Sequence, residues 1–78
     1  MNVQNVIDIT RRLTLAIDRD VNLAFDTSQW FVREVVIVAL SKGQSKQTVE
    51  VSMEETANAK IGSNELRSRL ENAIGQLS

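Results

Sequence analysis

The sequence has no cysteine, no histidine, no tyrosine and no proline. Without cysteine there is no disulfide framework, no thiolate nucleophile and no cysteine-based zinc site. Without histidine the commonest general base and metal ligand at neutral pH are also missing. In addition, a chain of 78 residues seldom encloses a pocket of about 300 Å³ or more, the usual size of a ligand site. We therefore expect a protein that is not an enzyme and that holds no metal and no cofactor.

Long apolar runs and targeting patterns are scarce as well. The longest apolar run is Val35 to Leu40, far below the ~20 residues that span a bilayer. Asp8 interrupts the first apolar stretch, and the basic pair Arg11–Arg12 follows it, which is the reverse of the order in a secretory signal. We expect a cytoplasmic protein with no membrane partner.

The composition is that of one small globular domain covering residues 1–78. Hydrophobic residues make up 42% of the chain and charged residues 24%, with a formal net charge of −1. No linker, repeat or low-complexity segment interrupts the sequence, and its glycines fall near the expected ends of elements. The balanced charge, without a basic cluster, argues against a large nucleic-acid contact, which depends on phosphate binding.

Apolar spacing in the first third predicts a helix over residues 3–17. Val3, Val6, Ile7, Thr10 and Thr14 fall near one side of such a helix, and Asn2 or Asn5 is suited to cap it. The alternation of apolar residues over 13–17 would also suit a strand, but the helical stripe is longer. Residues 21–25 alternate too and predict a short strand.

The middle of the chain predicts a β-hairpin over residues 31–40 and 46–53. Five of the seven residues from Val32 to Val38 are β-branched, which suits a pleated surface, and the unbroken apolar run predicts a strand covered on both faces. Gly43 suits a type I turn with a G1 bulge. The alternative is a helix over residues 28–42 ended by Gly43, which would make the protein mostly α-helical.

The last third predicts two helices. Ser52 and Glu55 form a capping-box pair, so a short helix should follow and end at Gly62, and Ser63 or Asn64 should cap the last helix. The last helix carries one apolar stripe: Leu66, Leu70, Ala73, Ile74 and Leu77. The predicted fold class is α+β, with an N-terminal helix, a central antiparallel hairpin that a third short strand can join, and a C-terminal amphipathic helix.

Two patterns resemble known binding motifs in part. Asp18, Asp20, Asn22 and Asp26 resemble the first ligand positions of an EF-hand loop, but Leu23 and Gln29 stand where the motif needs Gly and Glu, so a polar turn is the simpler interpretation. Residues 55–70 resemble a DNA-binding helix-turn-helix whose second helix bears Arg67 and Arg69. Few basic residues would remain there for phosphate.

The candidate partner-binding residues are Trp30, Phe31, Arg11 and Arg12. Trp30 and Phe31 would point to opposite faces of a strand. Either one of them belongs to the core and the other covers a sheet edge, or one of them anchors a partner. The arginine pair suits a partner, although a solvated helix face is the plainer interpretation.

These observations favour a non-enzymatic protein–protein interaction module: an accessory, adaptor or inhibitory protein of a microbe, phage or mobile element. The alternatives are a small nucleic-acid-binding or transcription-regulating protein and a structural subunit of a larger assembly. We also expect a homodimer or higher oligomer, because two modest helices can cover only one face of the predicted sheet. The alternative is a compact monomer in which residues 21–26 complete a three-stranded sheet and both helices wrap it.

Overall fold

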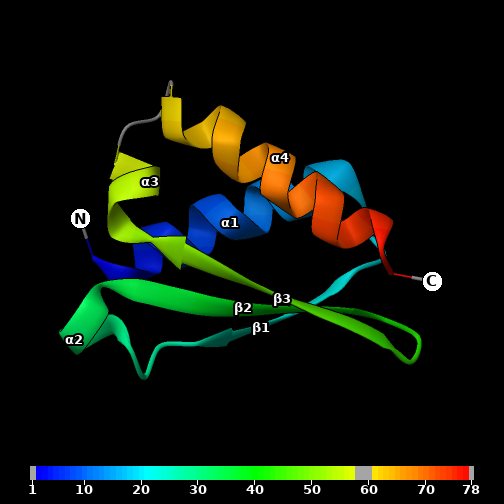
Figure 1. The fold of residues 1–78 in the computed structure, drawn as a ribbon, viewed down its shortest axis with the longest axis horizontal. Helices are drawn as coiled ribbons and strands as arrows, with labels where there is room; N and C mark the ends of the chain where they lie inside the picture. The colour runs from blue at the N-terminus through cyan, green and yellow to red at the C-terminus, as the bar shows by residue number, and fades with distance from the viewer. Residues whose placement is uncertain (1, 58–60, 78) are drawn as a thin grey trace.

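The computed structural model describes residues 2–57 and 61–77 and shows an α+β fold with the two long helices on one side of a sheet (Figure 1). The predicted fold class is confirmed, and the mostly helical alternative is wrong. The sheet is three-stranded and antiparallel, in the order β1-β2-β3. The elements in chain order are α1 (Val3–Ile17), β1 (Asn22–Asp26), α2 (Trp30–Arg33), β2 (Val35–Lys42), β3 (Ser45–Ser52), α3 (Met53–Ala57) and α4 (Ile61–Gly75).

The N-terminal helix α1 begins and ends where its apolar spacing predicts. Asn2 caps it, with its side-chain oxygen accepting a hydrogen bond of 3.0 Å from the backbone N–H of Asn5. Val6, Thr10 and Thr14, spaced one turn apart, are its fully buried residues. Leu15, which would be buried in a strand, is 40% exposed. The helical spacing of the apolar residues, and not their alternation over residues 13–17, therefore predicts the structure of this segment correctly.

The predicted third strand and hairpin are both present. Val38 on the central strand β2 faces Phe25 on β1 and Val49 on β3. The strands β2 and β3 are joined by the two residues Gly43 and Gln44, and only Gly43 has a positive φ, of 62°. That dihedral pattern belongs to a type II′ turn, so the predicted type I turn with a bulge is wrong. The tighter turn matches the twist of the flanking strands.

The predicted start of the central strand at residue 31 is wrong by four residues. Residues 30–33 form the single helical turn α2 instead, and Glu34 ends it in the left-handed conformation, with φ 54° and ψ 43°. The charged pair of Arg33 and Glu34 separates Val32 from the continuous apolar run. Only that run can be buried in the sheet, so the strand begins at Val35.

The sheet has one covered face and one open face. Leu40, Val36 and Val38 are fully buried beneath the helices, whereas Ile37 and Ala39 on the other side are half-buried. Val35, at the start of β2 on this second face, is only 6% exposed, but the residues beyond it on this face are not buried, so the expectation that β2 would be covered on both faces for much of its length is wrong. Because β2 pairs on both sides, it is not an exposed edge; the edges are β1 and β3.

The capping box at α3 is confirmed in both directions. Glu55 accepts from the backbone N–H of Ser52 at 3.1 Å, and the Ser52 hydroxyl accepts from the backbone N–H of Glu55 at 3.2 Å. The predicted extension of this helix over residues 58–60 lies outside the described residues.

The last helix begins earlier than predicted, and its apolar stripe is confirmed. Gly62 lies inside α4, so it does not end a helix, and neither Ser63 nor Asn64 precedes α4 as a cap. A glycine costs a helix only about 1 kcal/mol, and the later turns of α4 are anchored by burial. Leu66 and Leu70 are fully buried and Ile74 is 9% exposed.

Candidate functional site

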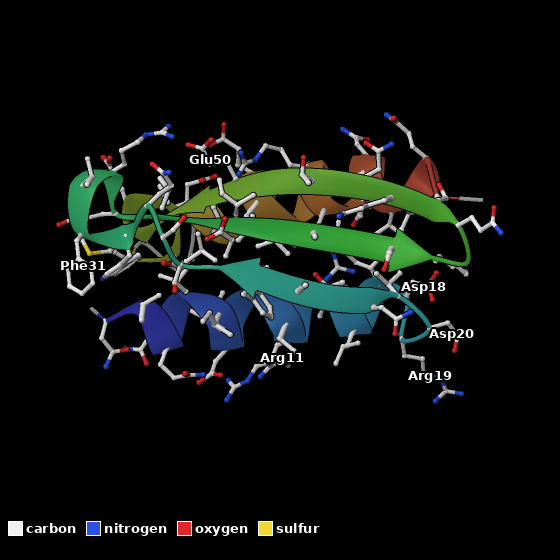
Figure 2. The ribbon with its side chains drawn as sticks, turned by 90° about the horizontal axis from the view of Figure 1, so that it is seen from below. Arg11, Asp18, Arg19, Asp20, Phe31 and Glu50 are labelled. Carbon is white, nitrogen blue, oxygen red and sulfur yellow. The ribbon has the colours of Figure 1, made fainter. Side chains whose placement is uncertain are left out.

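The most exposed apolar side chains lie together on α2. Phe31 is 96% exposed and Val32 is 83% exposed, while the adjacent Trp30 packs against the hydrophobic core. Figure 2 shows Phe31 at the end of the sheet, projecting away from the strands. The structure thus packs one of the two neighbouring aromatics, partly buried, against the core and leaves the other in water. Both aromatics lie on a helical turn, whereas the prediction placed them on a strand.

The turn that carries Phe31 is held at both ends by backbone hydrogen bonds. At its start, the N–H of Trp30 donates to the carbonyl of Thr27 at 3.1 Å. At its end, the N–H of Glu34 donates to the carbonyl of Trp30 at 2.9 Å, and the carbonyl of Glu34 accepts from Met53 at 2.9 Å. Phe31 and Val32 are therefore presented on a backbone that is hydrogen-bonded to Thr27 and to Met53, the first residue of α3.

A second tie joins this turn to the sheet. The guanidinium of Arg33 forms an ion pair and hydrogen bond with the carboxylate of Glu50 on β3. Both side chains are about half exposed (53% and 44%), so the pair adds little stability. Its effect is to orient α2 relative to the open face of the sheet, where Glu50 lies.

The arginines of α1 lie apart from Phe31. The guanidinium carbon of Arg11 is 5.3 Å from the centre of the Phe25 ring, within the range of a cation–π contact. The Asp8 carboxylate forms an ion pair with Arg11, 3.9 Å from a guanidinium nitrogen. Arg12 is exposed. Figure 2 shows Arg11 beside the middle of β1, well away from Phe31. The four predicted binding residues therefore do not form one site.

The acidic turn after α1 is held by hydrogen bonds to the Asp18 side chain. The carboxylate of Asp18 accepts from Lys42 Nζ at 2.8 Å and from the backbone N–H of Asp20 at 2.9 Å. The hydrogen bond from Lys42, followed by that from Asp20, lowers the pKa of Asp18 below its usual value, and Asp18 in turn raises the pKa of Lys42. Hydrogen bonds from Ser28 lower the pKa of Asp26.

The partial resemblance to a calcium loop is not realised in the geometry. Asn22 and Asp26 belong to β1, and Asp18 is paired with Lys42. Over residues 2–57 and 61–77, no group of three or more acidic, histidine or cysteine side chains is placed to hold a metal ion.

The arginines of the helix-turn-helix-like segment both have acidic partners. Arg67 Nε lies 2.9 Å from Glu71, one turn further along α4, and Arg69 pairs with Glu55 of α3. These carboxylates offset the charge that a phosphate contact would need. The predicted turn between the two helices lies outside the described residues.

The sequence did not predict that Val32 is exposed or that β3 lies at an edge of the sheet. Val32 had been counted among the β-branched residues of the strand. The signal that could have found it is the polar break of Arg33 and Glu34, which isolates Val32 from the apolar run. The order of strands carries no comparable local signal.

Comparison of the chain with protein-family models, with curated proteins and with solved structures finds no match in any of them. Within the described part of the chain, no helix has the length and apolar character needed to cross a membrane.

Proposed function

We propose that this protein is a non-enzymatic protein–protein interaction module whose anchor is the exposed pair Phe31 and Val32. The observation that carries the proposal is the contrast within α2: Trp30 packs into the core, while Phe31 and Val32 stay 96% and 83% exposed. Solvent-exposed aromatic side chains of this kind are suited to act as binding hot spots.

The energetics of such an anchor favour binding. Complete burial of a Phe or Val side chain contributes about 1.5–3 kcal/mol through the hydrophobic effect. The turn is already ordered by its hydrogen bonds to Thr27 and Met53, so a partner would not have to order the backbone, which lowers the cost of association. An apolar pocket on another protein is the complementary surface.

The roles that suit such a module are those of an accessory, adaptor or inhibitory protein, acting by occupying a surface of its partner. A phage or mobile-element origin and a cytoplasmic location belong to the same hypothesis. The pairing of Arg67 and Arg69 with carboxylates favours a protein partner over nucleic acid.

Site-specific photocrosslinking tests the proposal in the organism that encodes the protein. A benzophenone amino acid replaces Phe31 in one variant and Leu15, which is 40% exposed on α1, in the matched control. We expect a discrete protein adduct from position 31 and none from position 15. No adduct from position 31, or an adduct only with nucleic acid, would contradict the proposal.

Calorimetry with the identified partner then measures the contribution of the anchor. Phe31→Ser should weaken binding by at least about tenfold, since a hot spot contributes about 2 kcal/mol or more. Leu15→Ser should bind as the wild type does. Phe31→Ser should also leave the free energy of unfolding within about 0.5 kcal/mol, as exposed substitutions do. A loss of several kcal/mol would instead assign Phe31 a structural role.

A further inference from the structure

The strand β3 has one side without a pairing strand, and the hydrogen bonding of its other side shows which of its groups point outward. The N–H of Met53 donates to the carbonyl of Glu34 at 2.9 Å. This pair continues the register of β2 and β3, in which Val36 faces Val51. Because hydrogen-bonded and non-hydrogen-bonded pairs alternate along an antiparallel ladder, every second residue from Ser45 to Val51 bonds to β2. The backbone groups of the residues between them, from Lys46 to Ser52, point away.

At the Ser52 end of this edge, the outward backbone N–H already has a hydrogen-bond acceptor within the chain. The outward N–H of Ser52 donates to the Glu55 carboxylate at 3.1 Å, which agrees with the direction derived from the ladder. The outward N–H and carbonyl groups of Lys46, Thr48 and Glu50 have no partner among the described residues, and all three residues are exposed. An edge of this kind is a template for another strand.

The side chains along the edge are complementary in charge to those of a second copy of β3. Lys46, Thr48 and Glu50 alternate with inward residues and so lie on the open face of the sheet. An antiparallel strand with Thr48 opposite the partner's Thr48 places Lys46 opposite the partner's Glu50. The two-fold axis generates the same contact a second time, so two Lys46–Glu50 ion pairs form across the interface. Directly opposite charges stabilise such a pairing.

Other registers do not have this complementarity. A slip of two residues places Thr48 opposite the partner's Glu50 and removes both ion pairs. A parallel pairing of the same two edges requires one sheet to be turned over, so the Lys46 and Glu50 side chains of the two copies lie on opposite faces and form no ion pair.

We propose that the protein forms a two-fold dimer in which β3 pairs antiparallel with β3 of a second copy, centred on Thr48. The dimer doubles the three-stranded sheet. It does not depend on the proposed function, because Phe31 and Val32 lie on α2 and not on the edge that pairs.

A charge-exchange experiment tests both the edge and its register by sedimentation equilibrium. Lys46→Glu places a carboxylate opposite the partner's Glu50, and Glu50→Lys places two ammonium groups together. Each variant alone should dimerise at least about tenfold more weakly than the wild type, because both symmetric pairs become repulsive. An equimolar mixture of the two variants restores opposite charges at both positions and should form a heterodimer. The double variant should form a homodimer.

The controls separate this effect from other consequences of the substitutions. Glu50→Lys also removes the ion pair with Arg33, so Arg33→Gln is the matched control and should remain dimeric. Phe31→Ser should also remain dimeric, which separates this proposal from the proposed function. Thr48→Pro removes an outward N–H, a change that an edge strand tolerates, and it should give a folded monomer by circular dichroism.

Three results would overturn the proposal: a wild-type monomer across a hundredfold concentration range, dimerisation of both single variants at the wild-type strength, or a mixture of the two variants that stays monomeric. Persistence of the dimer in Thr48→Pro would place the interface elsewhere.

Discussion

The hydroxyl groups of Thr10 and Thr14 are expected to lower the stability of the protein. Both side chains are fully buried on the inner face of α1, and neither hydroxyl oxygen has a hydrogen-bond partner within the described part of the chain. A buried hydroxyl without a partner loses its hydration and gains no compensating bond. Replacing it with a methyl group should therefore stabilise the fold.

The size of the effect follows from the environment of Thr10. An unpaired buried hydroxyl costs about 1–3 kcal/mol in protein substitutions. Valine has nearly the same shape as threonine and a similar helix propensity, so neither packing nor helix formation should oppose the change. We expect Thr10→Val to raise the free energy of unfolding by about 1–2 kcal/mol. In a domain of this size each kcal/mol corresponds to a rise in Tm of about 4–8 °C.

Urea unfolding followed by Trp30 fluorescence measures this change, with an unchanged slope as the check that the unfolded state is not altered. Thr10→Ser is the matched control, because it keeps the hydroxyl and removes the methyl group, and it should lose about 1 kcal/mol. If Thr10→Val were destabilising, the hydroxyl would have a favourable bond in solution and the reasoning would be refuted.

Three further predictions concern the core, the start of the central strand and the acidic turn. Leu70→Ala should lower the free energy of unfolding by about 2–4 kcal/mol. Arg67→Ala, at an exposed position, should lower it by no more than about 0.5 kcal/mol. A neutral Leu70→Ala would contradict the burial of the α4 stripe. Glu34→Gly should stabilise the protein by about 0.5–1 kcal/mol in urea titration, because the left-handed conformation disfavours a side chain, and Glu34→Val, with a branched side chain, should destabilise it. Lys42→Met should raise the pKa of Asp18, measured by carboxyl NMR titration, toward its usual value. In the wild type the lowered pKa of Asp18 and the raised pKa of Lys42 mean that the pair stabilises the fold between the two pKa values. This contribution to stability is lost as the pH falls through the pKa of Asp18 or rises through the pKa of Lys42. An unchanged pKa of Asp18 in the Lys42→Met variant would show that the pair does not form.

Elements with strong local signals could be predicted from the sequence alone. The cap at Asn2 and the apolar stripe of α1, the capping box of Ser52 and Glu55, and the stripe through Leu70 each depend on residues within one or two helical turns. The hairpin was predictable for a similar reason, because β-branched residues flank a glycine at the distance that a tight turn needs.

The limits of α2 could not be predicted in the same way. Residues 30–33 are compatible with either a strand or a helical turn, and the choice depends on Trp30 packing into a core assembled from distant segments. The exposure of Phe31 follows from that choice, so the sequence pointed to two neighbouring aromatics as candidates without showing which of them stays exposed.

The free edge was decided entirely by tertiary structure. The sequence predicted the hairpin that pairs β2 with β3 and a third strand able to join it, but not that β1 would pair with the other side of β2. Strand order depends on contacts between residues far apart in the chain, and it alone makes β3 an edge and brings Lys46 and Glu50 to its open face. The sequence by itself thus determined the longer helices and the strands, because their signals are local, but not the helical turn α2. Only the packing of these elements decided which surfaces stay uncovered, because exposure depends on where every other element lies.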